Sequence, residues 1–297
     1  MTKAVNTKQV QPLVALGILF SLLSAITYGL NPIFAKLAYS CDLSGIEILH
    51  ARFIFAVVVL GLMGPFLQKD FYRFSRSLIR KSLFIGLLIL LPLNLLYVYA
   101  LKDIPASMMS LITYVYPLII LAINGLIFHK SIRANQIVSI TFILLGCLCI
   151  FSDAFKANIT YTALGLGFLS TFMYAVYLLS LQQLATNVSA YQITFLTLLF
   201  STIGLCFLHN PLFILRFDAM QLGTTFGYGV VSTVLSTICV SRAVQLLGAT
   251  QAGIFCSLLL GESIPAFRLV GMVFLILGIV IPNRVAIFKI FEAKFIS

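Results

Sequence analysis

Long apolar segments separated by short polar breaks run through this chain, and they restrict its possible folds more than any other feature. Ten segments follow one another, and no linker between them is long enough to separate domains. Most approach the ~20 residues that a helix needs to cross the ~30 Å hydrocarbon core of a bilayer. The predicted segments are residues 13–38, 45–67, 82–101, 106–128, 135–152, 162–184, 190–208, 222–245, 249–260 and 266–287. We therefore expect an all-α polytopic membrane protein with about ten transmembrane helices.

The composition excludes a water-soluble globule. Only 9% of the residues are charged and 61% are hydrophobic, whereas soluble domains carry roughly 25% charged residues. The net charge of +11 comes from basic residues in short loops, which is typical of topology signals and not of a nucleic-acid surface. Most of the six cysteines lie inside apolar segments without CxxC spacing, so we expect neither a disulfide framework nor a metal site.

An internal repeat divides the chain into two halves. Residues 125–150 align without a gap with residues 257–282, and eight of the 26 pairs are identical. Just upstream, residues 106–112 align with residues 249–255 at a spacing that is 11 residues larger. We predict five-helix repeats at 1–153 and 154–297, the second lacking about 11 residues near position 256. An odd number of spans per repeat inverts the second one, which places a binding site near the bilayer midplane and favours alternating access.

Basic residues predict the orientation. Placing the N-terminus in the cytoplasm puts 12 lysines and arginines on the cytoplasmic side and four on the outer side. We therefore expect a multi-pass protein of the cell's inner (plasma) membrane with both termini in the cytoplasm. The loop at 68–81 has Phe71, Phe74 and Leu78 at a helical spacing with arginines between them. This pattern predicts a short amphipathic helix on the anionic inner leaflet.

Three local sequences resemble a known transporter family. They are TYGLNPIFAKLA at 27–38, HARF at 50–53 and the region from AVQLLGATQAGIF to LLLGESI at 243–264. Together with ten short helices in two repeats, they resemble EamA-type members of the drug/metabolite transporter superfamily. The resemblance implies a carrier that exports or imports amino acids, nucleotide-like compounds or other small metabolites without ATP or any cofactor.

The second repeat departs from that family pattern. A helix over 249–260 would rise only ~18 Å, against a hydrocarbon core of ~30 Å. Three explanations remain open for this shortened helix 9. It is a half-helix buried among its neighbours, a helix lengthened by unwinding the turn at 246–249, or a degraded and inactive copy.

Lys36, Arg52 and Arg242 are the positive charges well inside apolar segments. A charge at the centre of a transmembrane helix costs about 2.5–3.5 kcal/mol on insertion scales, so it is expected to face a polar interior. One interpretation is that Lys36 and Arg52 hold an anionic or zwitterionic substrate, in which case Lys36→Met abolishes transport with little effect on folding. The alternative is that both side chains reach a membrane surface, with Arg52 paired to Glu47.

Polar and aromatic residues complete the predicted substrate site. Asn94, Tyr97 and Tyr174 lie deepest in their segments and are expected to hydrogen-bond the substrate, although interhelical hydrogen bonding alone would also explain them. Tyr28 and Asn31 share a helix face with Lys36, and Asn31-Pro32 is placed to break the first helix. The candidate binding residues are Lys36, Arg52, Tyr28, Asn31, Asn94, Tyr97, Tyr174 and Arg242.

These features predict a secondary transporter of a small polar metabolite, such as an amino acid, working by alternating access. We expect a proton or a counter-substrate as the coupled species, no nucleic-acid partner, and a monomer or homodimer in the lipid bilayer. The competing hypothesis is a transport-inactive relic or an accessory subunit of a lipid-linked sugar flippase, motivated by the short helix 9. An enzyme is not expected, because the sequence has no HExxH, GxSxG, glycine-rich phosphate loop or carboxylate cluster.

Overall fold

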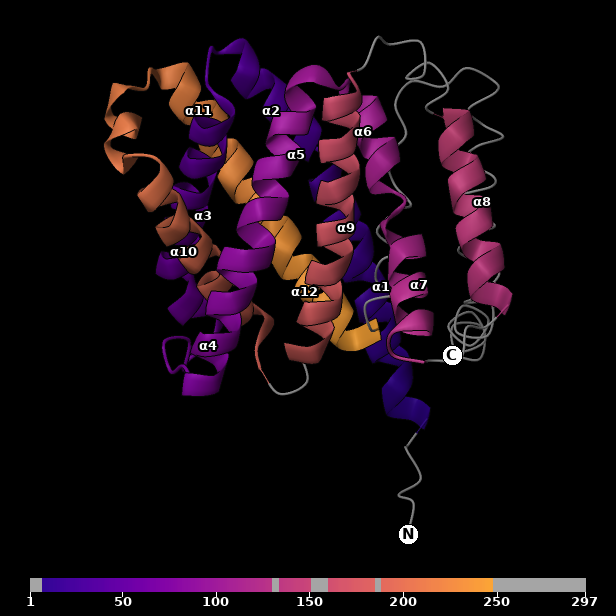
Figure 1. Cartoon of the computed structure of the whole chain (residues 1–297). Helices are drawn as coiled ribbons and strands as arrows, with labels where there is room; N and C mark the ends of the chain where they lie inside the picture. The colour runs from indigo at the N-terminus through magenta and orange to yellow at the C-terminus, as the bar shows by residue number, and fades with distance from the viewer. Residues whose placement is uncertain (1–6, 130–133, 151–159, 185–187, 248–297) are drawn as a thin grey trace, which may run out of the picture.

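The computed structural model describes residues 7–129, 134–150, 160–184 and 188–247, and this part of the chain is helical, without any strand (Figure 1). The α-helices are α1 (Thr7–Gly29), α2 (Asn31–Ser40), α3 (Gly45–Leu67), α4 (Arg76–Ile85), α5 (Leu91–Asp103), α6 (Ala106–Thr113), α7 (Tyr116–Leu126), α8 (Ala134–Ile150), α9 (Tyr161–Leu184), α10 (Ala190–Leu208), α11 (Ala219–Gly227) and α12 (Ser236–Leu247). Two π-helices, η1 (Gly86–Leu90) and η4 (Tyr228–Leu235), and the 3₁₀-helix η3 (Pro211–Arg216) complete the described part.

Seven helical stretches in the described part are long and apolar enough to cross a membrane. They are residues 16–40, 45–67, 76–103, 106–126, 161–184, 190–208 and 219–247. The fifth predicted segment is also a helix, α8, of 17 residues. Eight of the ten predicted segments are thus observed as helices in a multi-pass membrane protein. The segments at 249–260 and 266–287, and with them the shortened helix 9, lie outside the described residues.

Helices from distant parts of the sequence pack side by side. α1 lies along α12, α5 along α9, and α3 along both α10 and η4 (Figure 1). Small polar side chains join several of these pairs. Ser24 on α1 donates to the carbonyl oxygen of Ser236 at 3.2 Å, and Ser170 on α9 donates to that of Leu93 at 3.1 Å. Such bonds satisfy polar groups where water is excluded.

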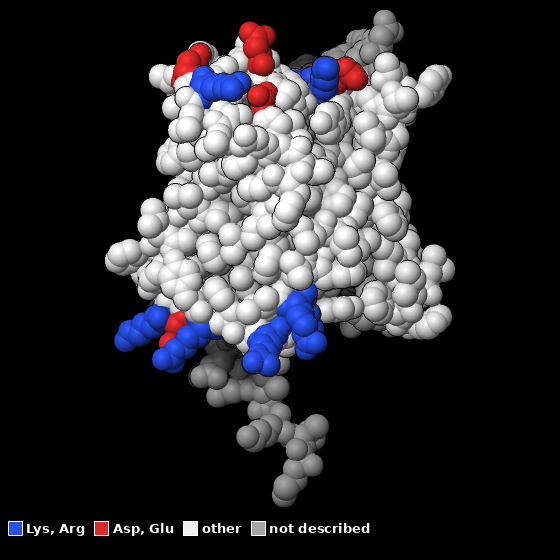
Figure 2. All heavy atoms as spheres, turned by 60° about the vertical axis from the view of Figure 1, so that its left-hand side comes forward, with Lys and Arg blue, Asp and Glu red and all other residues white. Residues whose placement is uncertain are grey.

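The two ends of the bundle differ in charge. The end that carries the start of α4 displays mainly blue Lys and Arg atoms, whereas the opposite end mixes both signs (Figure 2). We call the first the basic end, defined by Lys69, Arg73, Arg76, Arg80 and Lys81. Between the two ends the visible surface carries neither sign, as expected for the band that faces lipid.

Two of the spans are broken near their middle at a proline. The first span is interrupted at Leu30, so that α1 ends at Gly29 and α2 begins with Asn31-Pro32. The fourth span is interrupted between Thr113 and Tyr116-Pro117. Proline has no amide hydrogen, so neither residue continues the helical hydrogen bonds through its nitrogen. The break that Asn31-Pro32 predicted is therefore present, and a second one faces it across the cavity described below.

The spans at 76–103 and 219–247 each contain a π-helical segment, and in each segment a glycine lies in close contact with another helix. A β-carbon on Gly86 would lie 2.7 Å from the carbonyl oxygen of Thr197 on α10. A β-carbon on Gly229, which follows Gly86 by 143 residues, would lie 2.6 Å from the carbonyl oxygen of Arg52 on α3. In each place only glycine lets the two backbones approach so closely.

The correspondence extends to the neighbours of these two glycines. Besides Thr197, Gly86 is close to Phe200 and Ser201; besides Arg52, Gly229 is close to Phe55 and Ala56. Thr197, Phe200 and Ser201 of α10 follow Arg52, Phe55 and Ala56 of α3, respectively, by the same number of residues. The span at 76–103 therefore contacts α10 in the same way as the span at 219–247 contacts α3.

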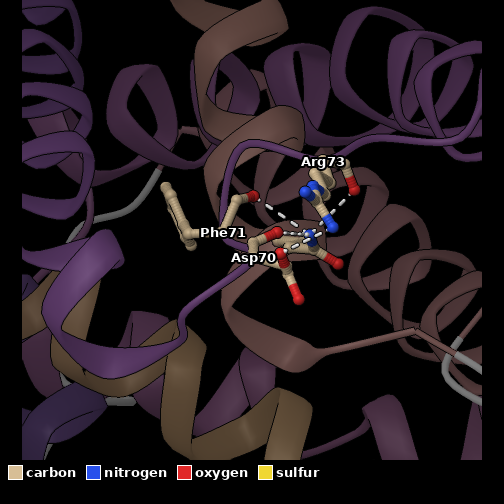
Figure 3. Close-up of polar contacts among 4 residues, drawn as sticks. Asp70, Phe71 and Arg73 are labelled. Atoms are coloured by element: carbon tan, nitrogen blue, oxygen red, sulfur yellow. Dashed lines mark hydrogen bonds and ion pairs between the residues drawn. The ribbon is translucent and has the colours of Figure 1, made fainter.

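The predicted amphipathic helix at 68–81 is wrong. Residues 68–75 form a loop, and α4 begins only at Arg76. Phe71 is 1% exposed and packs against Phe195, with ring centres 5.2 Å apart, so its apolar surface is covered by protein and not by lipid. The side-chain amide of Gln192 on α10 donates to carbonyl oxygens of this loop, those of Asp70, Phe71 and Arg73 (Figure 3). Phe71 is therefore apolar because the loop packs onto the bundle, and not because a helix lies on the membrane surface.

Candidate functional site

A cavity lies between the two broken spans (α1/α2 and α6/α7) and the helices α5 and α9. Its empty volume is about 840 Å³ when the space open to solvent is included. Five of the predicted binding residues line it, Tyr28, Asn31, Asn94, Tyr97 and Tyr174. They come from four different stretches of the chain, and only the packing of the helices brings them together. The other polar and aromatic lining residues are Ser110, Thr113, Tyr114, Tyr116, Ser170, Thr171 and Tyr177.

Tyrosine rings form one wall of this cavity around Tyr174. The ring of Tyr174 lies 5.0 Å from that of Tyr116 and 6.0 Å from that of Tyr28, both nearly perpendicular to it. Its ring also stacks on Tyr177 at 6.3 Å. Edge-to-face and stacked arrangements such as these are favourable for aromatic pairs. The wall therefore offers a ligand rigid apolar ring faces together with phenol groups.

Arg52 lies directly behind the opposite wall. Its side chain is 2% exposed, and its guanidinium donates to the side-chain oxygens of Asn31, at 3.3 Å, and of Asn94. The guanidinium carbon also lies 4.6 Å from the ring centre of Tyr228 in η4, and the Tyr228 hydroxyl donates to the same oxygen of Asn31. One buried cation is thus held by two amides of the cavity wall and by one aromatic ring.

No carboxylate neutralises Arg52 within the described part of the chain. The ion pair found there joins Arg73 to Asp70 at 3.1 Å, on the surface of the basic end. Glu47, the partner considered from the sequence, instead accepts hydrogen bonds from the backbone nitrogen and hydroxyl of Ser44 and caps α3. The Nε of Arg52 is buried and makes no hydrogen bond to a described residue. The cavity wall therefore carries a positive charge.

The hydrogen bonds of Arg52 fix the orientation of both amides. Arginine only donates hydrogen bonds, so the oxygens of Asn31 and Asn94 must point toward it. The Nδ2 of Asn94 donates to the carbonyl oxygen of Leu90 at 2.8 Å. The remaining donor is the Nδ2 of Asn31, a cavity residue. The wall can therefore offer an N–H group, backed by a full positive charge, to a ligand oxygen.

Comparison with known proteins supports the family resemblance found in the sequence. Residues 15–152 match the EamA-like transporter family. The match covers somewhat less than half of the chain. The resemblance to the drug/metabolite transporter superfamily that the sequence predicted is confirmed over these residues. No curated protein is similar enough to match the sequence.

A solved structure shares the fold of this protein. It is a crystal structure described only as that of a protein, and the similarity covers 91% of this chain and 97% of that chain. The TM-score is 0.63 and the sequence identity is 14%. At this identity the likeness concerns the fold alone.

Two of the charges predicted for the substrate site, Lys36 and Arg242, lie outside the cavity lining. The Nζ of Lys36 donates to the carbonyl oxygen of Lys102, at 3.3 Å, in the last turn of α5, where a cation is favoured by the helix dipole. The guanidinium carbon of Arg242 lies 5.0 Å from the ring centre of Tyr191 at the start of α10. Neither residue lines the cavity.

Sequence reasoning missed two parts of the site. Tyr228, which holds Arg52 and Asn31, lies in the eighth predicted segment and nothing in its local sequence marks it. Ser110 and Thr113 precede Tyr116-Pro117, and the proline is a signal that could have identified them, because Asn31-Pro32 breaks the first span in the same way.

Proposed function

We propose that this EamA-like protein is a secondary transporter and not an enzyme, and that it carries a small polar metabolite with a carboxylate or phosphate group. The observation that carries the proposal is Arg52, a buried cation behind the cavity wall without a carboxylate partner in the described part of the chain. Burying an unneutralised charge is costly, so a negative group on the substrate supplies the missing partner. Amino acids and phosphorylated metabolites are the small molecules that meet this requirement.

The substrate site has two chemically different sides. Asn31, supported by Arg52, faces the anionic group of the substrate. The tyrosine wall around Tyr174 packs against the remainder of the molecule. Lys36 and Arg242 act outside this site, since their contacts lie at α5 and α10.

Alternating access between two five-helix halves, residues 1–153 and 154–297, is the proposed mechanism. The equivalent contacts of Gly86 with α10 and of Gly229 with α3 support it, because each joins one half to the other. The concentration of lysine and arginine at the basic end supports cytoplasmic termini in the inner membrane. The cavity lies between these contacts and the broken helices, where the motion of one half against the other would expose it to either side.

A counterflow assay in proteoliposomes tests the proposal. Radiolabelled amino acids, nucleotides and sugar phosphates are screened with the unmodified chain, then with Arg52→Gln and with Arg242→Gln as the matched control. Arg52→Gln should reduce uptake of an anionic substrate at least tenfold, and Arg242→Gln should retain most of it. Equal uptake by all three proteins would contradict the assigned role of Arg52, and uptake of neutral compounds alone would contradict the substrate class.

A binding measurement separates substrate recognition from transport. The chain has no tryptophan, so Tyr174→Trp places a single indole fluorophore in the cavity wall. We expect the substrate found by counterflow to change the emission of this indole. The same ligand should leave the emission of a Phe207→Trp variant unchanged, because Phe207 is 87% exposed and far from the cavity lining.

A further inference from the structure

A second cavity lies at the basic end, between α4 and α9, and shares no lining residue with the substrate cavity. It has about 870 Å³ of empty volume. Ser77, Arg80, Lys81, Phe84 and Ile85 line it from α4. From α9 it is lined by Ser180, Gln183 and Leu184. The proposed transport function uses none of these residues.

Most polar groups of this second cavity have no partner among the described residues. Arg80 and Lys81 form no ion pair with a described carboxylate. The side chains of Ser77 and Gln183 likewise make no hydrogen bond within the described part of the chain, whereas Ser180 donates to the carbonyl oxygen of Val176 at 2.8 Å. Two cations and two neutral polar groups therefore converge on one concave surface and are available to a ligand.

The cavity changes from basic to apolar along the direction of the membrane normal. On α4, Ser77, Arg80 and Lys81 precede Phe84 and share a helix face with it. Arg80 and Lys81 precede Phe84 by three or four residues, a rise of ~5 Å, so the basic groups lie nearer the end of the bundle and Phe84 lies nearer the bilayer centre. Exposed apolar residues continue toward the bilayer centre with Leu83 on α4, 40% exposed, and Leu88 on η1, 57% exposed. A ligand with a charged head and apolar chains fits this gradient.

We propose that this cavity binds the phosphate headgroup of an anionic phospholipid. Arg80 and Lys81 contact the phosphate, Ser77 and Gln183 donate hydrogen bonds to its oxygens or to the headgroup, and Phe84 and Leu184 contact the acyl chains. Basic pockets between transmembrane helices near a membrane surface are suited to such lipids, since the surface of the anionic leaflet concentrates them there. The lipid would join α4 to α9 at the end of the bundle where α9 is followed by the 185–189 connection.

Native mass spectrometry of the whole chain, released from neutral detergent, tests the proposal directly. The probes are phosphatidylglycerol, phosphatidylcholine of the same chain length, and inorganic phosphate. We expect phosphatidylglycerol to bind the unmodified chain more tightly than phosphatidylcholine, and inorganic phosphate not to displace it. In Arg80→Gln/Lys81→Gln, phosphatidylglycerol should bind about thirtyfold more weakly, from about 1 kcal/mol per basic residue.

A charge-matched variant separates the cavity from the general attraction of the basic end. Lys69→Gln/Arg76→Gln removes the same charge from the same end but alters no lining residue, and it should retain most of the phosphatidylglycerol affinity. Arg80→Lys/Lys81→Arg keeps both charges and should also retain the phosphatidylglycerol affinity. It shows whether substitutions at these two positions leave the helix folded. Equal loss in both neutralised variants would overturn the site. Displacement of the lipid by inorganic phosphate, or equal binding of the two lipids, would overturn the lipid assignment.

Discussion

A β-carbon on Gly229 would lie 2.6 Å from the carbonyl oxygen of Arg52, so the backbones of η4 and α3 touch beside the substrate cavity. This contact places Tyr228 beside the Arg52 guanidinium, with 4.6 Å between that group's carbon and the ring centre. The position of the buried charge therefore depends on a close approach between η4 and α3, which are far apart in the sequence.

Gly229→Ala should separate these two helices and disturb Arg52. We expect a loss of about 1–3 kcal/mol in the free energy of unfolding, the usual cost of an inserted methylene in a packed interior, together with weaker substrate binding. Thermal unfolding in detergent and the Tyr174→Trp emission measure the two effects. Gly223→Ala is the control, because a β-carbon there meets nothing within 4 Å. An equal response of both variants would show that the contact does not position Arg52.

Asn94→Asp should place a carboxylate against Arg52 and neutralise the charge at the cavity wall. A charge at ~6 Å with an effective dielectric constant of ~20 contributes roughly 3 kcal/mol. We therefore expect the affinity for an anionic substrate to fall by about a hundredfold. Asn210→Asp adds the same charge outside the cavity, and its side-chain oxygen can still accept the hydrogen bond from the Leu212 backbone nitrogen. This control variant should therefore bind the anionic substrate as tightly as the unmodified chain. Unchanged affinity in Asn94→Asp would refute the electrostatic role of Arg52.

Lys36→Met tests which of the two sequence-based interpretations of this lysine holds. Its ammonium group binds the Lys102 carbonyl oxygen at 3.3 Å and does not line the cavity. We therefore expect the Tyr174→Trp emission to show substrate affinity changed by no more than about threefold. The free energy of unfolding should fall by about 1 kcal/mol, the typical net value of one hydrogen bond. Loss of substrate binding in a stably folded Lys36→Met protein would restore Lys36 to the site.

Gln192→Ala should release the loop at 68–75. The Nε2 of Gln192 lies 3.0 Å from the carbonyl oxygens of Asp70 and Phe71 and 3.1 Å from that of Arg73 (Figure 3). Removing a donor shared by three carbonyl groups should cost about 1–3 kcal/mol of unfolding free energy and speed tryptic cleavage after Lys69 and Arg73. Gln183→Ala removes an amide that bonds no described residue, and its cleavage rate should match that of the unmodified chain.

The sequence alone determined that this is a multi-pass helical protein that resembles the EamA-like transporter family. Apolar length fixes where helices cross a bilayer, because every backbone polar group must be satisfied inside the helix there. Asn31-Pro32 also predicted the break between α1 and α2, since proline removes a helical hydrogen bond wherever it lies. Such properties depend on local chemistry, so they can be read along the chain.

Only the tertiary structure decided which polar residues act together. Lys36 and Arg52 look alike in the sequence, as single cations within apolar segments. Helix packing leaves the first at the last turn of α5 and buries the second behind Asn31 and Asn94. Phe71 likewise has the spacing of a lipid-facing residue, yet it packs against Phe195 from a span more than a hundred residues away. Contacts between distant helices depend on how whole faces pack, and no local pattern encodes that.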